Sequence, residues 1–213
     1  MSTYSSDTTD ERQGGYHHGN LREALLEQGL ALLEETGSQD FSLRELARRV
    51  GVSANATYRH FANKEDLARA MAAEGIRRFA AAQQESWQRA SGSVSEKFLA
   101  TGCAYVHFAR QHPSLFRLMF GRFVAEHRSE EFAVASEQAF TALRLGVSAA
   151  LGLEPASEQA TLAAYNAWAV VHGFSYLILD GQLRDGTQDV EALVEQALRG
   201  WMLTAVAEIE GSP

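Results

Sequence analysis

The stretch that decides the fold runs from Ser42 to Leu67 and reads SLRELARRVGVSANATYRHFANKEDL. It opens with a helix-start signal, because Ser42 is followed three residues later by Glu45, the spacing of a capping box. Phe41 and Leu46 occupy the two positions of a hydrophobic staple around the same start. We therefore predict a short helix over 43–49, with Ser42 as its cap and Glu45 reaching back to the backbone of Ser42.

A second short helix follows after a tight turn. Gly51 lies between two valines, and a glycine there can adopt the positive φ that such a turn requires. Ser53 is placed to cap the second helix, which we expect to end near His60. Asn63 then caps a longer helix that we expect to continue to about residue 90.

Two short helices joined by a tight glycine turn form the helix-turn-helix arrangement. The second helix of this arrangement enters the major groove of DNA and contacts it through its N-terminal end. Small residues there let the backbone approach the bases, Asn55 can bind a base edge or a phosphate, and Arg44 can bind a phosphate or a guanine. The candidate DNA-binding residues are Arg44, Ser53, Ala54, Asn55, Ala56, Tyr58, Arg59, His60 and Lys64.

The charge distribution supports this interpretation. The 213-residue chain has a formal net charge of −8, which by itself argues against nucleic acid as a partner. Residues 42–64, however, carry a net +4, so the rest of the chain carries −12. A basic segment within an acidic chain is the electrostatic footprint expected of a local DNA-binding surface, although chance clustering on a solvated surface explains the charge alone equally well.

Composition excludes several other classes of protein. Hydrophobic residues make up 46% and charged residues 22%, as in ordinary globular proteins. The single cysteine, Cys103, cannot form an intrachain disulfide, which fits a reducing compartment. The polar N-terminus does not resemble a signal peptide. The charge-free segment 159–179 is long enough to span a membrane, but we interpret it as a helix buried on all sides by protein. We expect a cytoplasmic protein with no membrane span.

The remaining sequence predicts an all-α protein, because strand-like alternation is absent. A first helix begins at a cap at Asn20 and ends at Gly37, and Ser91-Gly92-Ser93 marks the clearest break between helices. Further helices are expected at about 95–111, 113–121, 130–151, 157–180 and 188–209. We divide the chain into a flexible arm (1–15), a helix-turn-helix domain (16–65) and a regulatory and dimerisation domain (66–213).

The last helix carries a continuous apolar stripe at steps of three and four residues. Packing against the core of its own domain is one explanation. Together with the charge-free helix before it, however, the stripe offers more apolar surface than one small domain needs, and this favours a dimer interface. The candidate interface residues are Leu193, Ala197, Leu198, Trp201 and Met202.

Aromatic residues and methionines gather in the second half of the chain. Trp168, His172 and Tyr176 share one helical face, and each has a polar group that needs a partner. Such residues often form a core, but as a group they suit a largely apolar pocket for an uncharged or weakly charged, apolar or aromatic molecule. The candidate ligand-binding residues are Tyr105, Phe108, Phe116, Met119, Phe120, Phe140, Trp168, His172 and Tyr176.

Three alternatives remain open. An enzyme could use Cys103 with His107, but no orienting third group is visible. His17 and His18 could bind a metal, but zinc needs further ligands, so we expect neither a metal site nor a cofactor. The C-terminal domain could also serve dimerisation or a protein partner alone, with no small-molecule ligand.

Several of these motifs resemble those of the TetR family of transcriptional regulators. The most specific are Tyr58, His60, Phe61 and Lys64, in the pattern Tyr-x-His-Phe-x-x-Lys. The segment 15–22, GYHHGNLR, is similar to the start of the first helix in one large branch of the family. The motif WAVVHG at 168–173 and the run HPSLFRLMF at 112–120 resemble the C-terminal domain of that branch.

The resemblance implies a homodimer that binds a palindromic or pseudo-palindromic operator and represses transcription. It implies that a ligand in the C-terminal domain shifts the fourth helix and changes the spacing of the two recognition helices. It also places Arg44, Ala54, Asn55, Ala56, Tyr58, His60 and Lys64 at DNA-contacting positions. Thr57 departs from the pattern, since leucine or proline is usual there; if it faces the core, its hydroxyl needs a partner such as a carbonyl one turn back.

Overall fold

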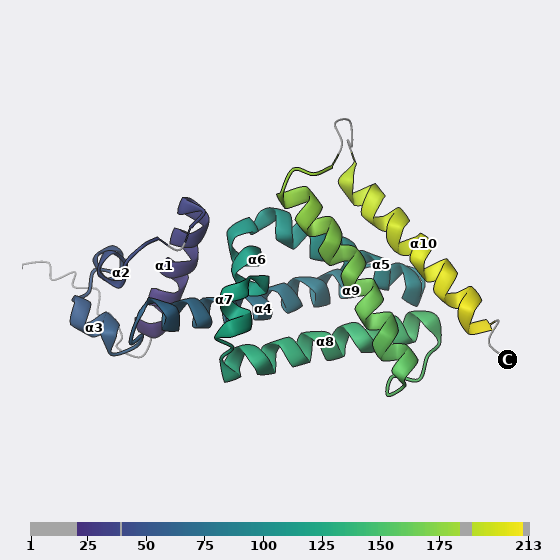
Figure 1. Cartoon of the computed structure of the whole chain (residues 1–213), viewed down its shortest axis with the longest axis horizontal. Coiled ribbons are helices and arrows are strands. Elements are labelled where there is room, and N and C mark those ends of the chain that lie inside the picture. The colour runs from purple at the N-terminus through teal and green to yellow at the C-terminus, as the bar shows by residue number, and fades with distance from the viewer. Residues whose placement is uncertain (1–20, 39, 184–188, 211–213) are drawn as a thin grey trace, which may run out of the picture.

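A computed structural model describes residues 21–38, 40–183 and 189–210, and these residues form ten helices and no strand (Figure 1). The predicted all-α class is therefore confirmed. The helices are α1 (Leu21–Thr36), α2 (Leu43–Val50), α3 (Ala54–Tyr58), α4 (Lys64–Arg89), α5 (Val94–Gln111), α6 (Pro113–Phe120), α7 (Arg122–Glu126), α8 (Glu130–Leu151), α9 (Glu158–Leu179) and α10 (Val190–Glu210).

Local capping signals set several of these boundaries. The Oγ of Ser42 accepts a hydrogen bond from the backbone N–H of Glu45 at 3.1 Å, and the side chain of Asn63 accepts one from the N–H of Asp66 at 2.8 Å. Gly51 ends α2 with a φ of 76°, as the turn requires. The predicted return contact from Glu45 is not made within this part of the chain, so only half of the capping box forms.

Some details differ from the prediction, and others fall on residues that the structure does not describe. Helix α3 ends at Tyr58, two residues earlier than expected, and the short helix α7 was not predicted. The expected cap at Asn20 and the arm at 1–15 lie outside the described residues.

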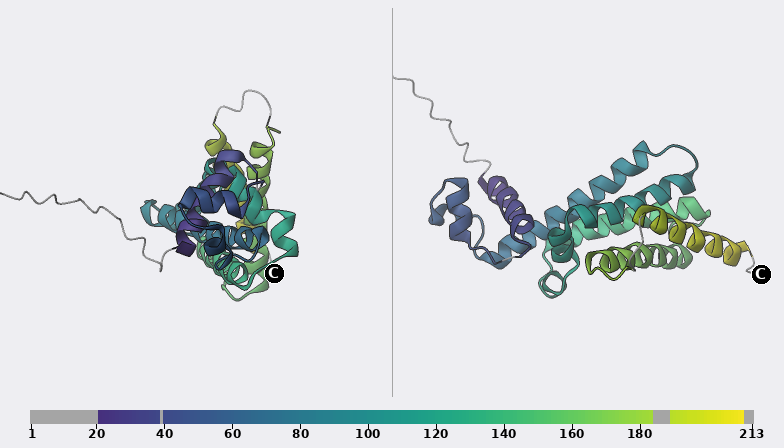
Figure 2. Two further views of the ribbon diagram at one scale, coloured as in Figure 1. Left: turned by 90° about the vertical axis from the view of Figure 1, so that its left-hand side faces the viewer. Right: turned by 90° about the horizontal axis from the view of Figure 1, so that it is seen from above.

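Helices α1, α2 and α3 form a small module at one end of an elongated molecule (Figures 1 and 2). Leu25 in α1, Leu46 in α2, Phe61 just after α3 and Leu67 in α4 are fully or almost fully buried, so the three helices of this module share one core with the start of α4. Leu46 and Phe61 lie before and after α3 in the sequence. Because both are buried in this core, the core fixes the orientation of α3 although the helix has only five residues.

Helix α4 connects this module to the rest of the protein. Its 26 residues correspond to a length of about 39 Å. Figure 2 shows it leaving the N-terminal module and running into the C-terminal bundle, where it packs against α5, α6 and α8. Helix α9 packs on α5 and α8, and α10 packs on α5 and α9. The cavity described below lies among these helices.

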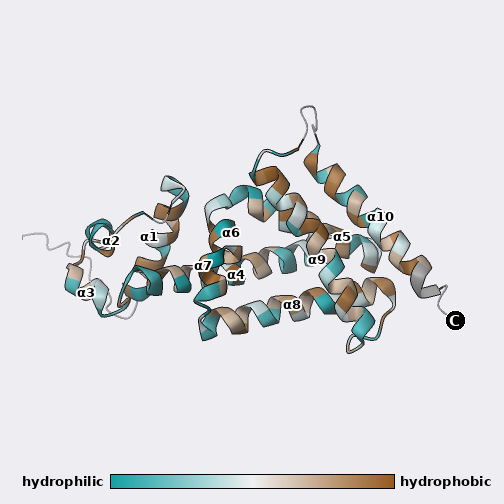
Figure 3. Ribbon diagram, in the orientation of Figure 1, coloured by the Kyte–Doolittle hydropathy of each residue, from teal (hydrophilic) through white to brown (hydrophobic). Residues whose placement is uncertain are grey.

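Helix α9 is not buried on all sides, which corrects the sequence interpretation. It is long and apolar enough to cross a membrane, yet such a single helix is weak evidence for a span. Leu162, Tyr165 and Leu177 on its outer face are 62%, 53% and 43% exposed. Figure 3 shows hydrophobic residues along both α9 and α10. The sequence correctly indicated an apolar helix, but composition alone does not show whether residues of the same chain bury its outer face.

Candidate functional site

Helices α2 and α3 lie at the free end of the molecule (Figure 1), and the residues exposed on them are polar. Arg44, Asn55, Tyr58 and Arg59 are exposed there, and Tyr58 is 47% exposed despite its aromatic ring. The Oγ of Ser53 caps α3 by accepting a hydrogen bond from the N–H of Ala56 at 3.2 Å. The remaining candidates, Ala54, Ala56, His60 and Lys64, are half-buried around the same helix.

The positive charge of this end is only partly neutralised. Arg49 forms an ion pair with Glu35 at 2.7 Å. Arg44, Arg48 and Arg59 form none with the residues that the structure describes. The ammonium group of Lys64 lies 5.9 Å from the centre of the Phe41 ring, and this cation–π contact holds the ammonium group close to the module.

Thr57 lies on the opposite side of α3, facing the core. Its exposed fraction is 0%, and its Oγ1 has no hydrogen-bond partner in the described part of the chain. The sequence analysis expected a bond to a carbonyl one turn back, and this bond is not present. A buried hydroxyl without a partner lowers the stability of the fold.

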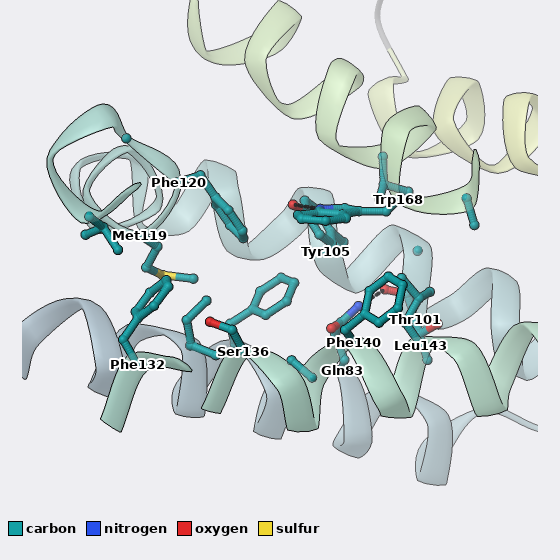
Figure 4. Close-up of a pocket in the computed structure, with 18 of the residues that line it drawn as sticks. Gln83, Thr101, Tyr105, Met119, Phe120, Phe132, Ser136, Phe140, Leu143 and Trp168 are labelled. Carbon is teal, nitrogen blue, oxygen red and sulfur yellow. Dashed lines mark hydrogen bonds between the residues drawn. The ribbon is translucent and has the colours of Figure 1, made fainter. Parts of the chain in front are cut away.

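The C-terminal bundle encloses a cavity of about 380 Å³ (Figure 4). Figure 4 shows Tyr105 and Trp168 covering one side, Met119 and Phe132 at one end, and Phe140 towards the other. The volume lies at the lower end of the range of about 300–1,000 Å³ that is typical of small-molecule sites. Five of the nine predicted ligand-binding residues line it: Tyr105, Met119, Phe120, Phe140 and Trp168.

The other four predicted residues do not line the cavity. Phe108 and Phe116 are buried core residues at 5% and 0% exposure. The rings of His172 and Tyr176 pack against Phe116, with ring centres 5.7 Å away in both cases. These four residues therefore form an aromatic support behind the wall.

Sequence reasoning missed much of the lining. Two kinds of residue were overlooked: further apolar residues contributed by α4, α5 and α8, and a few polar side chains among them. They include Phe79, Phe98, Phe132, Leu143, Gln83, Thr101, Arg128 and Ser136. Helical spacing in α8 gave a signal for Phe132, Ser136 and Phe140, which follow one another at steps of four.

A hydrogen-bonded chain joins the cavity wall to its support. The Nε1–H of Trp168 donates to the hydroxyl oxygen of Tyr105 at 3.0 Å, and this oxygen lies 2.7 Å from Nδ1 of His172. Because the hydroxyl already accepts from the indole, its own proton is available to Nδ1, and His172 is then neutral. Burial lowers the pKa of His172 and raises that of the Tyr105 hydroxyl, so both groups stay uncharged at neutral pH.

Helix α6 lies between the cavity and the N-terminal module. At its C-terminal end, Met119 and Phe120 line the cavity. At its N-terminal end, the backbone N–H of Leu115 donates to Oε1 of Glu34 in α1 at 3.1 Å. Between them, α6 packs on the backbone of Gly75 in α4: a Cβ added there would lie 2.7 Å from Sδ of Met119. The same eight-residue helix thus contacts the cavity, α1 and α4.

The predicted interface residues on α10 divide into two sets. Leu198 and Met202 are 1% and 7% exposed, and Leu198 lines the cavity, so these two belong to the interior of the protomer. We correct their assignment on that ground. Leu193, Ala197 and Trp201 are half-buried, and Leu203, which was not predicted, is 73% exposed.

Cys103 and His107 line a separate surface hollow with Glu191. Burial, with the charges of Glu195 and Glu191, raises the pKa of the Cys103 thiol to about 11. The thiol is therefore protonated at neutral pH, which is the opposite of an activated nucleophile. The described residues contain no group of three or more metal-binding side chains, and His17 and His18 lie outside them.

Comparison with known proteins identifies both halves of the chain. The family model for bacterial regulatory proteins of the tetR family matches residues 25–71, and the model for the tetracyclin repressor-like C-terminal domain matches residues 98–200. An uncharacterized HTH-type transcriptional regulator of Mycobacterium tuberculosis is 27% identical over 164 residues, which make up 77% of this chain and 72% of that protein.

Solved structures share the architecture. One from Rhodococcus sp. RHA1, described as a protein with unknown function, is 31% identical with a TM-score of 0.78, covering 90% of this chain and 98% of that one. A TetR variant from Acinetobacter baumannii AYE in complex with minocycline is 19% identical with a TM-score of 0.59, covering 88% of this chain and 97% of that one. At 19% identity, the second similarity shows the fold alone.

Proposed function

Because the chain belongs to the TetR family of DNA-binding transcriptional regulators, we propose that it is a homodimeric repressor which a small, largely apolar or aromatic molecule releases from its operator. In this proposal residues 16–65 bind DNA and residues 66–213 bind the effector and the second protomer, in the cytoplasm. The observation that carries the effector step is the 380 Å³ cavity, whose wall includes the end of α6.

The exposed face of α3 is the surface that would enter the major groove. Asn55 lies near the N-terminal end of α3 and is exposed, so we assign it to base reading. Tyr58 and Lys64, further along the same surface, are assigned to phosphate contacts, with Arg44 contributing from α2. Arg44, Arg48 and Arg59, which form no ion pair within the described residues, favour DNA although the chain as a whole is acidic.

The outer face of α9, with α10 beside it, would form the dimer interface. No Asp, Glu, Lys or Arg occurs between residues 159 and 179. Leu162, Tyr165 and Leu177 are exposed on α9, and Leu203 is exposed on α10. Gly173 also lies on the exposed face, where an added Cβ would meet open space. A glycine weakens a helix by about 1 kcal/mol relative to alanine, and the close approach of a second helix would compensate for this.

Helix α6 would couple the cavity to DNA. A molecule entering the cavity must share space with Met119, which rests on Gly75 of α4. A movement of Met119 would shift α6, and the contact of Leu115 with Glu34 would pass the shift to α1. The effector releases DNA only if it binds the shifted arrangement more tightly than the DNA-bound one.

DNA binding by fluorescence anisotropy tests this function. The probe is the intergenic DNA beside the protein's own gene, compared with an unrelated duplex at low and high salt. We expect a preference for the first duplex that persists at high salt. Equal binding of both duplexes, lost at high salt, would be the phosphate contribution alone and would count against a specific operator there.

The effector step is tested with small molecules that raise the melting temperature of the protein, since a ligand of the folded state stabilises it by mass action. Those that do so should also lower the anisotropy of the protein–DNA complex. A variant with a filled cavity, Ala139→Trp, should bind DNA but lose both responses. DNA binding that responds to no molecule stabilising the protein would favour the alternative, a DNA-binding dimer without a small-molecule effector.

A further inference from the structure

The lining of the proposed effector cavity carries positive charge and no negative charge among the described residues. Among the lining residues that the structure describes, Arg128 is the only one with a full charge, and no Asp or Glu belongs to the lining. Arg128 is exposed, so it lies where the cavity opens to solvent. An arginine at the mouth of an otherwise apolar cavity attracts a negatively charged group.

Arg128 is available to such a group. The neighbouring acidic side chains have other partners, since Glu126 pairs with Arg122 at 2.6 Å and Glu131 with Arg22 at 3.6 Å. Glu130 is exposed in the first turn of α8 and does not line the cavity. Arg128 itself forms no ion pair with a residue in the described part of the chain.

The guanidinium group is also held in place. Its Cζ lies 5.7 Å from the centre of the Phe132 ring, which is itself buried at 8% exposure and lines the cavity. Because this cation–π contact already restricts the side chain, Arg128 loses less conformational entropy when it binds a ligand. No hydrogen bond to another described residue occupies the five N–H donors of Arg128, so they can bind an acid group.

A second donor points to the same ligand. Ser136, one turn beyond Phe132 on α8, lines the cavity, and its Oγ is buried without a hydrogen-bond partner among the residues that the structure describes. Figure 4 shows it between Phe132 and Phe140. A buried hydroxyl is normally paired, so an acceptor atom of a bound molecule would complete its bonding. The rest of the wall is mainly aromatic and aliphatic.

We propose that the cavity takes an amphipathic monoanion: a single acid group bound by Arg128, an acceptor atom bound by Ser136, and an apolar or aromatic body against Tyr105, Trp168 and Phe140. This inference rests on the proposed function and narrows its effector class to weak organic acids. The volume of about 380 Å³ suits a body of two or three aromatic rings or a medium-length chain.

Two fluorescent probes that differ by one sulfonate test the proposal. Both 1-anilinonaphthalene-8-sulfonate and the uncharged N-phenyl-1-naphthylamine are titrated into the full-length protein and its variants. Arg128→Gln should weaken binding of the sulfonate about tenfold and leave the uncharged probe within twofold. Arg122→Gln is the matched control, because Arg122 is 90% exposed on its side chain and does not line the cavity. It should change neither affinity.

Further arms define the site and separate the two proposals. Decanoate should compete with the uncharged probe better in the wild type than in Arg128→Gln, whereas decan-1-ol should compete equally in both. The filled variant Ala139→Trp, or Leu143→Trp if the first fails to fold, should bind neither probe. If the uncharged probe binds and Arg128→Gln leaves the sulfonate unaffected, the preference for an acid is refuted and the effector cavity stands. If neither probe binds the wild type, both proposals fall.

Discussion

Replacement of Thr57 by valine should stabilise the protein. The two side chains have nearly the same shape, and valine exchanges the hydroxyl for a methyl group. Thr57 is 0% exposed, and no described residue forms a hydrogen bond with its Oγ1, so the exchange removes an unpaired polar atom from the core of the N-terminal module. Most substitutions at a fully buried position have the opposite sign.

The expected gain follows from two contributions. A buried hydroxyl without a hydrogen bond costs about 1–3 kcal/mol in mutational studies. The added methyl group contributes roughly 0.8 kcal/mol more by being buried, while the helix propensities of the two residues are similar. Allowing for imperfect packing, Thr57→Val should raise the free energy of unfolding by about 1–2 kcal/mol. For a chain of this size, that corresponds to about 3–6 °C in melting temperature.

Urea denaturation followed by circular dichroism measures this change, with Thr57→Ser as the paired variant. Serine keeps the hydroxyl and removes the methyl group, so we expect it to destabilise the protein by about 1 kcal/mol. A valine variant that is less stable than the wild type would refute the reasoning. It would mean that the hydroxyl does bond in solution, for example to the carbonyl of Ser53 one turn back.

The other predictions concern DNA, the dimer and pH. Lys64→Ala should weaken binding to every duplex and reduce the salt slope of log K by about 1, whereas Asn55→Ala should reduce the preference for the operator; anisotropy at several salt concentrations measures both. Leu162→Arg, at 62% exposure, should yield a folded monomer in sedimentation experiments, while Val94→Arg, exposed outside α9 and α10, should remain dimeric. The pKa of His172 is lowered from 6.5 by burial, so protonation favours the unfolded chain. Its contribution to stability should be complete above pH 6.5 and decline below it, and His172→Gln should lessen the fall in melting temperature from about pH 7 to about pH 5.5. An unchanged fall would mean that His172 is not the group responsible.

The sequence predicted the helices well because their boundaries depend on neighbouring residues. Ser42 and Asn63 start α2 and α4 by bonding to backbone groups three residues away, and Gly51 ends α2 in a conformation that it adopts readily. The short helix α7 has no side-chain cap in the structure and therefore left no such signal. The fold class and the order of helices could be predicted for the same local reason.

The cavity was predicted only in part because its lining depends on how helices pack. Trp168 and His172 share one face of α9, yet only Trp168 lines the cavity, and the ring of His172 packs instead against Phe116 and Phe120, with ring centres 5.7 and 4.9 Å away. Leu198 belongs to the apolar stripe of α10, but the absence of a side chain at Gly102 lets it reach into the protomer. Neither relation is visible from spacing within one helix.

The position of α6 also bears on how such a regulator can diversify. The helices α5, α8 and α9 supply most of the side chains of the cavity wall, whereas α4 and α6 line the cavity and also pack against α1. In the proposed function, substitutions at wall positions such as Phe140 or Leu143 would therefore change which effector binds and leave the DNA-contacting face of α3 unchanged. Conversely, in the proposed function, changes at Asn55 would alter the DNA sequence that is bound and leave the effector specificity unchanged. In a regulator with this arrangement, effector recognition and DNA recognition can therefore evolve independently of each other.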